Sequence, residues 1–235
     1  MAVVSIREVV KEYRAQDAPV RALDGVSLEV EAGEFVSLVG RSGCGKTTLL
    51  NLAGAMDFPT AGRVVIDGED TARLDDAALT ALRRRKVGFV FQFFQLLPTL
   101  TAAENVELPL QLAGESDVRA RALERLRLVE MESYADRFPH QLSGGQMQRV
   151  AIARSIVHGP KLLLADEPIG NLDSTSAEVV MQLLRRVADE LGAAILMATH
   201  SLEAAKITDT LVRLRDGRIE ERRRLGAAAE RVPLG

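Results

Sequence analysis

The chain has 235 residues, of which 47% are hydrophobic and 27% charged, with a formal net charge of −3. This length and composition are typical of a globular protein with a large core, and the slight acidic excess gives no reason to expect nucleic acid as a partner. A single cysteine excludes an internal disulfide, and neither a leader pattern nor a run of ~18 apolar residues is seen, so we expect a cytoplasmic protein that reaches a membrane only through a partner.

Strands and helices alternate along most of the chain. Apolar runs that end at a glycine or a polar turn occupy residues 35–40, 87–92, 161–167 and 193–200. Their non-alternating pattern is typical of strands buried on both faces of a parallel sheet. Helical patterns lie between them, at 46–56 and 176–192. This alternation predicts an α/β fold.

Two regions depart from that alternation. The N-terminal third and residues 63–70 are typical of hairpins, with turns expected at 32–33 and 67–68. Between residues 96 and 158 no strand is predicted, and a helix is expected there with Ser116 as its N-cap. The sequence therefore predicts a helical lobe inserted into an α/β core.

The end of the chain carries no chemical motif. After Gly217 the sequence is charged and then alanine-rich, which predicts a last strand followed by a loose end. The basic runs at 83–86 and 222–224 are interpreted as solvated surface.

The segment GRSGCGKTT, residues 40–48, follows a predicted strand and opens a predicted helix. Glycines let the backbone curl so that its N–H groups face phosphate oxygens, and the helix start adds a positive dipole end. Lys46 would place a cation beside the β and γ phosphates, and Thr47 would offer a hydroxyl to Mg²⁺. We therefore expect nucleotide contacts from Gly40, Arg41, Ser42, Gly43, Cys44, Gly45, Lys46, Thr47 and Thr48.

Two carboxylates end the third apolar run. Asp166 could hold Mg²⁺ or its water, and Glu167 could act on an attacking water. An acidic pair at a strand end can also cap the next helix, but beside the 40–48 loop we favour catalysis.

A second glycine cradle lies at QLSGGQMQRVAIARS, residues 141–155. A serine hydroxyl, bare glycine backbone and a helix start can bind an anion. The residues alone allow an equal alternative, a helix capped by Ser143 with a flexible lead-in.

These motifs together resemble the ATP-binding subunits of ABC transporters, and the resemblance covers essentially the whole chain. The loop at 40–48 resembles their Walker A loop, LSGGQ at 142–146 their signature, and LLLADE at 162–167 their Walker B motif with its glutamate. Gln92 resembles the Q-loop glutamine, and NLD at 171–173 resembles the D-loop. His200 resembles the switch histidine, and Tyr13 stands where the family stacks an aromatic ring on adenine.

The resemblance implies a P-loop NTPase core with a parallel sheet, an N-terminal antiparallel β subdomain and an inserted α-helical subdomain. It implies one ABC ATPase domain over residues 1–235, with the core at 1–95 and 159–235 and the helical subdomain at 96–158. The implied cofactors are ATP and Mg²⁺, with the metal held by Thr47, Gln92 and Asp166.

The resemblance also implies a homodimer in which each signature closes over the ATP held by the opposite chain. The catalytic residues would be Lys46, Glu167 and His200. The opposite chain would contribute Ser143, Gly144, Gly145, Gln146 and Asp173.

Four phenylalanines gather in residues 89–94, and the apolar loop around Phe93–Leu97 is expected to receive a membrane permease subunit. The alternative is a packing seam between lobe and core. Residues 96–114 and 167–174 resemble the lipoprotein-release and macrolide or antimicrobial-peptide export group. The chain would then work on the inner face of the cell membrane. A cell-division ATPase that regulates a membrane partner and a non-transport ABC ATPase remain as alternatives.

Cys44 lies inside the first loop, near a helix start that favours thiolate. One hypothesis is that alkylation blocks ATP binding and that ATP protects the thiol. The other is that a small side chain merely fills space there.

Overall fold

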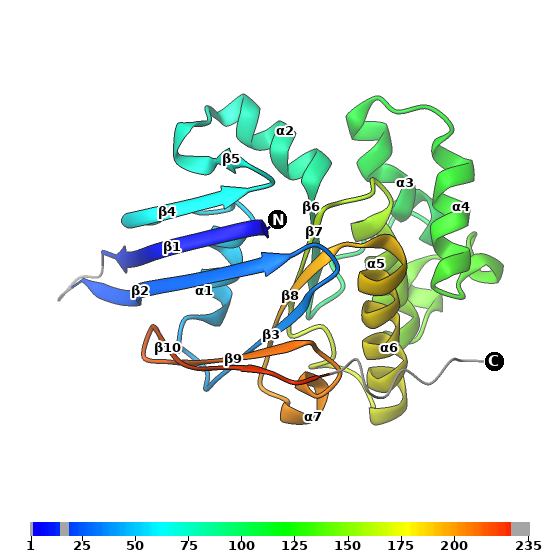
Figure 1. Cartoon of the computed structure of the whole chain (residues 1–235). Helices are drawn as coiled ribbons and strands as arrows, with labels where there is room; N and C mark the ends of the chain where they lie inside the picture. The colour runs from blue at the N-terminus through cyan, green and yellow to red at the C-terminus, as the bar shows by residue number, and fades with distance from the viewer. Residues whose placement is uncertain (1, 15–18, 227–235) are drawn as a thin grey trace.

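The computed structural model describes residues 2–14 and 19–226 and contains two sheets. The first is antiparallel, in the order β2-β1-β4-β5. Its strands are β1 (Ala2–Tyr13), β2 (Val20–Glu31), β4 (Ala61–Ile66) and β5 (Glu69–Asp70). Figure 1 shows β1, β2 and β4 side by side as one layer, with α1 (Lys46–Ala53) packed behind them.

The second sheet has six strands in the order β10-β9-β3-β8-β7-β6. All pairings are parallel except β9 with β10. Its strands are β3 (Phe35–Val39), β6 (Val87–Phe91), β7 (Leu162–Asp166), β8 (Ala194–Thr199), β9 (Thr210–Arg215) and β10 (Arg218–Arg224). The four apolar runs of the sequence are thus β3, β6, β7 and β8, which confirms the predicted parallel core.

Helices fill the stretch between β6 and β7 and gather on one side of the six-stranded sheet (Figure 1). They are α3 (Ala102–Ala113), α4 (Val118–Leu128), α5 (Gly144–Ile156) and two short turns, η2 (Glu132–Tyr134) and η3 (Pro139–Gln141). No strand lies in residues 96–158, all of which are described, as predicted. The remaining helices are η1 (Thr71–Arg73), α2 (Asp76–Lys86), α6 (Ser174–Leu191) and α7 (Leu202–Ala205).

The six-stranded sheet is buried on both faces, which explains its non-alternating sequence. On β7, Leu163 packs into one apolar cluster with α3, α4, α5 and α6. Leu162 and Leu164 point the other way, into a cluster with α1 and the antiparallel sheet. Both faces of each strand must therefore be apolar.

The predicted hairpin at residues 32–33 is wrong. Gly33 makes a turn with a φ of 71°, but β2 and β3 belong to different sheets. β3 is buried at every residue, so its backbone groups need a hydrogen-bonded strand on each edge, and it pairs in parallel with β8 and β9. β2 alternates buried and exposed residues and pairs with β1. The predicted turn at 67–68 is confirmed, because Ile66 pairs with Glu69 across it.

Smaller differences concern helix ends. The N-cap of α4 is Asp117, with a φ of 54° and no side-chain cap, so the prediction of Ser116 is wrong by one residue. Ser116 instead donates to the Asp117 carboxylate at 3.3 Å. α2 and β9 were not predicted. The last strand expected after Gly217 is β10, and the loose end falls largely on residues 227–235, outside the described residues.

Candidate active site

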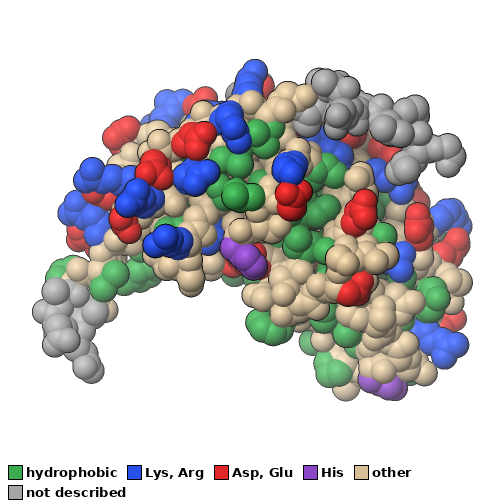
Figure 2. All heavy atoms as spheres, turned by 90° about the horizontal axis from the view of Figure 1, so that it is seen from below, with side chains coloured by type: hydrophobic (Ala, Val, Ile, Leu, Met, Phe, Trp, Pro, Cys, Tyr) green, Lys and Arg blue, Asp and Glu red, His purple; other side chains and the backbone are tan. Residues whose placement is uncertain are grey.

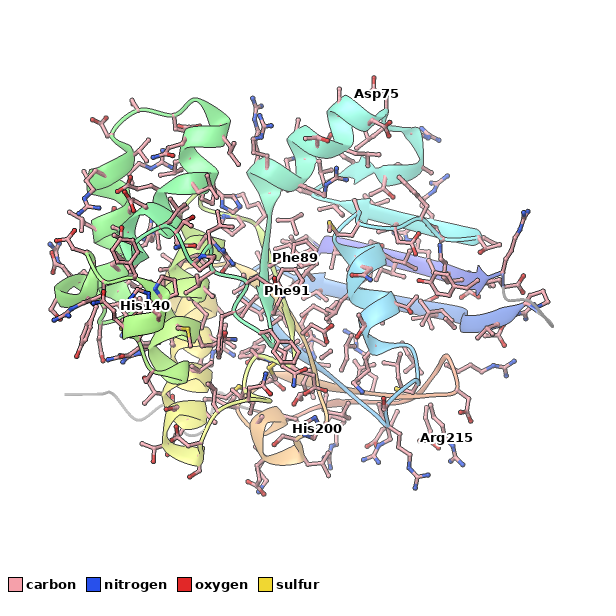
Figure 3. All side chains as sticks on the ribbon, turned by 180° about the vertical axis from the view of Figure 1, so that it is seen from behind. Asp75, Phe89, Phe91, His140, His200 and Arg215 are labelled. Atoms are coloured by element: carbon pink, nitrogen blue, oxygen red, sulfur yellow. The ribbon has the colours of Figure 1, made fainter. Side chains whose placement is uncertain are left out.

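The register of the parallel strands brings four motifs to one edge of the sheet. Val39 pairs with Thr199, Ala198 with Asp166, and Asp166 with Phe91. The next residue on each strand therefore leaves the sheet at the same edge, where α/β proteins bind ligands. Those residues are Gly40, His200, Glu167 and Gln92. In Figure 3, Phe89 and Phe91 follow one another down β6, and His200 lies further down.

The first cradle is a glycine turn that leads into α1. Gly43 and Gly45 have φ values of 80° and 107°, and Gly45 is the N-cap of the helix. A Cβ at Gly45 would lie 2.6 Å from the carbonyl oxygen of Ala22, so a larger residue is excluded there. The Lys46 ammonium is held inside the loop, donating to the carbonyls of Gly40 at 2.7 Å and Arg41 at 3.3 Å. Arg41, Ser42, Gly43 and Thr47 are exposed.

Thr47 and Asp166 meet across the cradle. The Thr47 hydroxyl donates to Oδ2 of Asp166 at 3.0 Å. Burial raises the pKa of Asp166, and the neighbouring Glu167 adds to this, against the hydrogen bond from Thr47. A positive charge beside this carboxylate would counter the burial. The pair thus offers two oxygen ligands to a hard cation.

Glu167 and His200 form a second pair at the same edge. Nδ1 of His200 lies 2.9 Å from Oε2 of Glu167, and the His200 backbone N–H donates to the same oxygen at 3.3 Å. Glu167 has a φ of 47°, which is rare for a non-glycine residue and typical of functional sites. The Glu167 side chain is 17% exposed and the His200 side chain 71%. A mostly buried carboxylate is therefore oriented by an accessible imidazole.

Gln92 is tied to the segment that follows Glu167. Its side-chain amide donates to Oδ1 of Asn171 at 3.4 Å, and the Asn171 amide donates to the Gln92 carbonyl at 3.2 Å. A Cβ at Gly170 would lie 2.8 Å from Nε2 of Gln92. Asn171 therefore positions the Gln92 side chain. The sequence indicated this residue only as the first member of the NLD segment.

The second cradle lies at the start of α5. Ser143 is the N-cap, accepting from the N–H of Gln146 at 3.3 Å, while the Gln146 side chain accepts from the N–H of Ser143 at 2.9 Å. The capping alternative is therefore realised, and it leaves the anion site open because Ser143 is also exposed. A Cβ at Gly145 would lie 2.6 Å from Oγ of Ser176, whose N–H is capped by Asp173.

The two cradles contact different parts of the chain. The 40–48 loop packs against Ala22 on β2 and Leu214 on β9. A Cβ at Gly144 in the second cradle would lie 3.5 Å from Leu172 and 3.7 Å from Phe94. Each cradle thus has its own surroundings within one chain.

Tyr13 is 40% exposed and is held by two residues that sequence reasoning missed. Its hydroxyl donates to Oδ2 of Asp57 at 2.9 Å, and Nζ of Lys11 lies 4.8 Å from its ring centroid. Lys11 also pairs with Asp57 at 2.6 Å. Burial raises the pKa of the Tyr13 hydroxyl, and the Asp57 carboxylate adds to this. Asp57 and Lys11 lie far apart in sequence, so no local pattern indicated them.

The apolar loop after Gln92 is divided between surface and core. Phe93 is 67% exposed and Leu97 43% exposed, while Leu96 packs against the helical cluster. Leu96 thus lies in the packing seam between lobe and core, while Phe93 and Leu97 are exposed at the surface. In the separate 40–48 loop, Cys44 is 7% exposed and belongs to the apolar cluster that contains α1 and the antiparallel sheet.

Comparison with known proteins decides the family. Residues 23–170 match the family model described as ABC transporter. The chain belongs to the ABC transporter family. It is an ATP-hydrolysing cassette of that family, as its two cradles and carboxylates indicate.

Three relatives cover most of this ABC cassette. It is 46% identical to the "Uncharacterized ABC transporter ATP-binding protein MJ0796" of Methanocaldococcus jannaschii, over 94% of this chain and 97% of that one. It is 44% identical to the "Lipoprotein-releasing system ATP-binding protein LolD 2" of Caulobacter vibrioides, over 94% and 98%. It is 45% identical to the "Macrolide export ATP-binding/permease protein MacB" of Syntrophobacter fumaroxidans, over 94% of this chain and 31% of that longer protein.

Two solved structures share the fold. One is described as the dimeric structure of MJ0796, a bacterial ABC transporter cassette, with a TM-score of 0.87 and 45% identity over 94% of this chain and 98% of that one. The other is described as a dimeric post-hydrolysis state of the same cassette bound to ADP and Pi, with a TM-score of 0.86 and the same identity and coverage.

Proposed function

We propose that this chain powers a membrane transport complex by forming a homodimer that closes on two ATP molecules. The observation that carries the proposal is the presence of two anion cradles with separate surroundings on one chain. A second copy, turned head-to-tail, would bring the Ser143 cradle over the 40–48 loop. The dimer described for the M. jannaschii cassette supports this arrangement.

Within each site, we assign roles from the contacts of the chain's own residues. The Lys46 ammonium and the N–H groups of the 40–48 loop would spread the charge of the γ-phosphate. Glu167, oriented by His200, would accept a proton from the attacking water. His200 is exposed enough to donate to the γ-phosphate as well. Ser143 and Gly145 of the second copy would complete the cage, with Asp173 at the interface.

Mg²⁺ fits the oxygen donors at this site. Thr47 and Asp166 are hard ligands that already lie in contact, and Gln92 follows the strand residue paired with Asp166. When bound, the ion would neutralise phosphate charge. We infer that these three residues hold it.

We also infer the partner and its place. Phe93 and Leu97 form the exposed apolar part of the loop that would receive a cytoplasmic segment of a permease. LolD and MacB, whose names describe lipoprotein release and macrolide export, support this group for the chain. Within residues 2–14 and 19–226, no helix combines the length and apolar character needed to span a bilayer. The chain would therefore sit on the inner face of the membrane through its partner.

The two subdomains of the chain would also have separate roles in the closing and opening of the dimer. We propose that residues 96–158 form a helical subdomain that carries the signature, while 1–95 and 159–235 form the core that holds ATP. Closure of the dimer would bring the helical subdomain of one copy to the core of the other, and hydrolysis would release it.

The proposal is tested by mixing two inactive variants. Lys46→Ala removes the first cradle's cation, and Ser143→Arg blocks the second cradle. Each homodimer should be inactive, but a mixed dimer contains one site with Lys46 from one chain and Ser143 from the other. Mixing should therefore restore ATP hydrolysis. If mixing restores none, and the wild-type rate per chain stays constant as the protein is diluted to monomers, the site is complete in one chain and the proposal is wrong.

A further inference from the structure

The helix that begins with the signature, α5, carries on its later turns two side chains that bind the loop around Gln92. Gln148 and Arg154 both donate hydrogen bonds to backbone carbonyls of that loop or of the strand before it. Both residues lie beyond the glycine turns at 40–48 and 143–146 that are assigned to phosphate binding. Their contacts connect segments that are more than fifty residues apart.

Arg154 holds the loop through its guanidinium fork. It donates to the carbonyl of Gln95 at 2.6 Å and to that of Phe94 at 2.9 Å. Within the described part of the chain, no carboxylate forms an ion pair with it. Burial lowers the pKa of this guanidinium. Arg154 is partly buried, and its two hydrogen bonds to carbonyls offset the cost of taking its charge out of water.

The two residues that Arg154 holds have an unusual backbone. Phe94 and Gln95 have φ values of 56° and 53°, in the left-handed region that favours glycine. Two consecutive non-glycine residues there persist only when their surroundings hold them. The Arg154 fork accounts for that, because it fixes both carbonyls at once.

Gln148 binds the backbone of two different segments, one before Gln92 and one after Glu167. Its side chain is fully buried, and its amide donates to the carbonyl of Pro168 at 2.7 Å and to that of Phe91 at 3.3 Å. Phe91 precedes Gln92, and Pro168 follows Glu167. One side chain thus ties α5 to the backbone beside the metal-binding glutamine and beside the general base.

We propose that Arg154, supported by Gln148, is a positioning residue for ATP hydrolysis that holds the Gln92 loop in register with the signature helix. Gln92 and residues 143–146 then move as one body, so a displacement of Phe93 or Leu97 by a partner reaches both. The inference rests on the roles of Gln92 and of the second cradle given under the proposed function.

The loop itself provides the first readout. Arg154→Met should raise amide hydrogen exchange in residues 92–97 of the full-length protein without ligand. Arg154→Lys, which keeps the charge but loses the planar fork, should have an intermediate effect. The matched control is Arg149→Met, because Arg149 lies on the same helix and donates to the carbonyl of Val129 instead. Unchanged exchange in 92–97 in both Arg154 variants would overturn the proposal.

Catalysis provides the second readout. Arg154→Lys should raise the Mg²⁺ concentration for half-maximal hydrolysis by about tenfold, since supporting residues commonly change metal affinity by that factor. In a Gln92→Ala background the same change should add nothing. If Gln92→Ala alone leaves the Mg²⁺ requirement unchanged, the assigned role of Gln92 fails, and hydrogen exchange alone judges Arg154. If Gln92→Ala raises it and Arg154→Lys does not, the positioning role is wrong.

Discussion

Nδ1 of His200 lies 2.9 Å from Oε2 of Glu167, and the backbone N–H of His200 donates to the same oxygen at 3.3 Å. One residue therefore orients the carboxylate twice. Glu167 is itself held by a backbone hydrogen bond from its N–H to the carbonyl of Ala198 at 2.9 Å, on the strand that directly precedes His200. The two side chains are a single unit fixed by the pairing of β7 with β8.

Glu167→Gln should bind ATP and form a stable dimer while hydrolysing it slowly. The amide keeps the shape of the side chain but cannot accept a proton from water, and loss of a general base commonly costs about 10²–10⁴-fold in rate. Single-turnover hydrolysis and size-exclusion chromatography with ATP measure the two properties. A variant that turns over near the wild-type rate would remove Glu167 from its role.

His200→Ala should lower hydrolysis by roughly 10²-fold with ATP affinity little changed, because the carboxylate loses its orientation. Residues that act as a unit are not additive, so adding His200→Ala to Glu167→Gln should cost little more. Single-turnover rates of the two single variants and the double variant form the cycle. Independent, multiplying losses would contradict a shared function.

Gly145→Ala, together with its companion variant, separates the role of Gly145 in packing within the chain from its proposed role in binding ATP. The new methyl would meet the Ser176 side chain, which is fixed because its hydroxyl donates to Asp173 at 2.7 Å. We expect a loss of about 1–3 kcal/mol in the free energy of unfolding, as overpacking commonly costs, and loss of hydrolysis. Denaturant unfolding and ATPase assays measure both.

The companion variant is Ser176→Gly, alone and combined with Gly145→Ala. It removes the colliding atoms, so the double variant should regain stability. Hydrolysis should stay low, because a side chain at residue 145 would still shift the backbone that is proposed to contact the partner's ATP. Recovery of hydrolysis together with stability would show that Gly145 matters only for packing within one chain.

Sequence reasoning reached the parallel core because each strand of it is apolar on both faces. Leu162 and Leu163 belong to different apolar clusters, and a run of this kind has few other interpretations. The candidate site followed for the same reason: its motifs stand directly after those strands. Local pattern and fold agree at Gly40, Glu167 and His200.

The parts that sequence reasoning missed depend on contacts between distant segments. The turn at residues 32–33 has hairpin chemistry, yet the partner of β3 is decided by β8, which lies about 160 residues later. The Asp57 pairing with Lys11 and the hold of Arg154 on Phe94 carry no local signature. Secondary-structure propensity depends on neighbouring residues in the sequence, so it cannot predict contacts between distant segments.

Asp57→Asn should destabilise the protein in a pH-dependent way. Burial acts to raise the pKa of Asp57, but hydrogen bonds from Lys11, the Phe58 N–H and Tyr13 outweigh it and hold the pKa below its ordinary value. A depressed pKa means that the carboxylate contributes stability above its unfolded pKa, and that this is lost as the pH falls through the folded pKa. Since the side chain is 28% exposed, we expect about 1 kcal/mol at pH 7.

Urea unfolding from pH 7 to pH 3 measures this, and the difference between wild type and variant should shrink in the acid range. Asp216→Asn is the matched control, because the Asp216 side chain is 95% exposed. A difference that is constant with pH would mean that the Asp57 charge does not act through Lys11.

Alkylation of Cys44 distinguishes the two hypotheses for this residue, namely that its modification blocks ATP binding or that its side chain merely fills space. Its thiol lies against Gly40, since a Cβ there would be 2.6 Å from Sγ, and the side chain is 7% exposed. Alkylation by iodoacetamide should therefore be slow, because the loop must open first. Once attached, the adduct has no room beside Gly40, so ATP binding should be lost, and bound ATP should slow the reaction further by holding the loop closed. Cys44→Ala should keep ATP binding. Rapid alkylation that leaves ATP affinity intact would show that the thiol faces solvent away from the cradle.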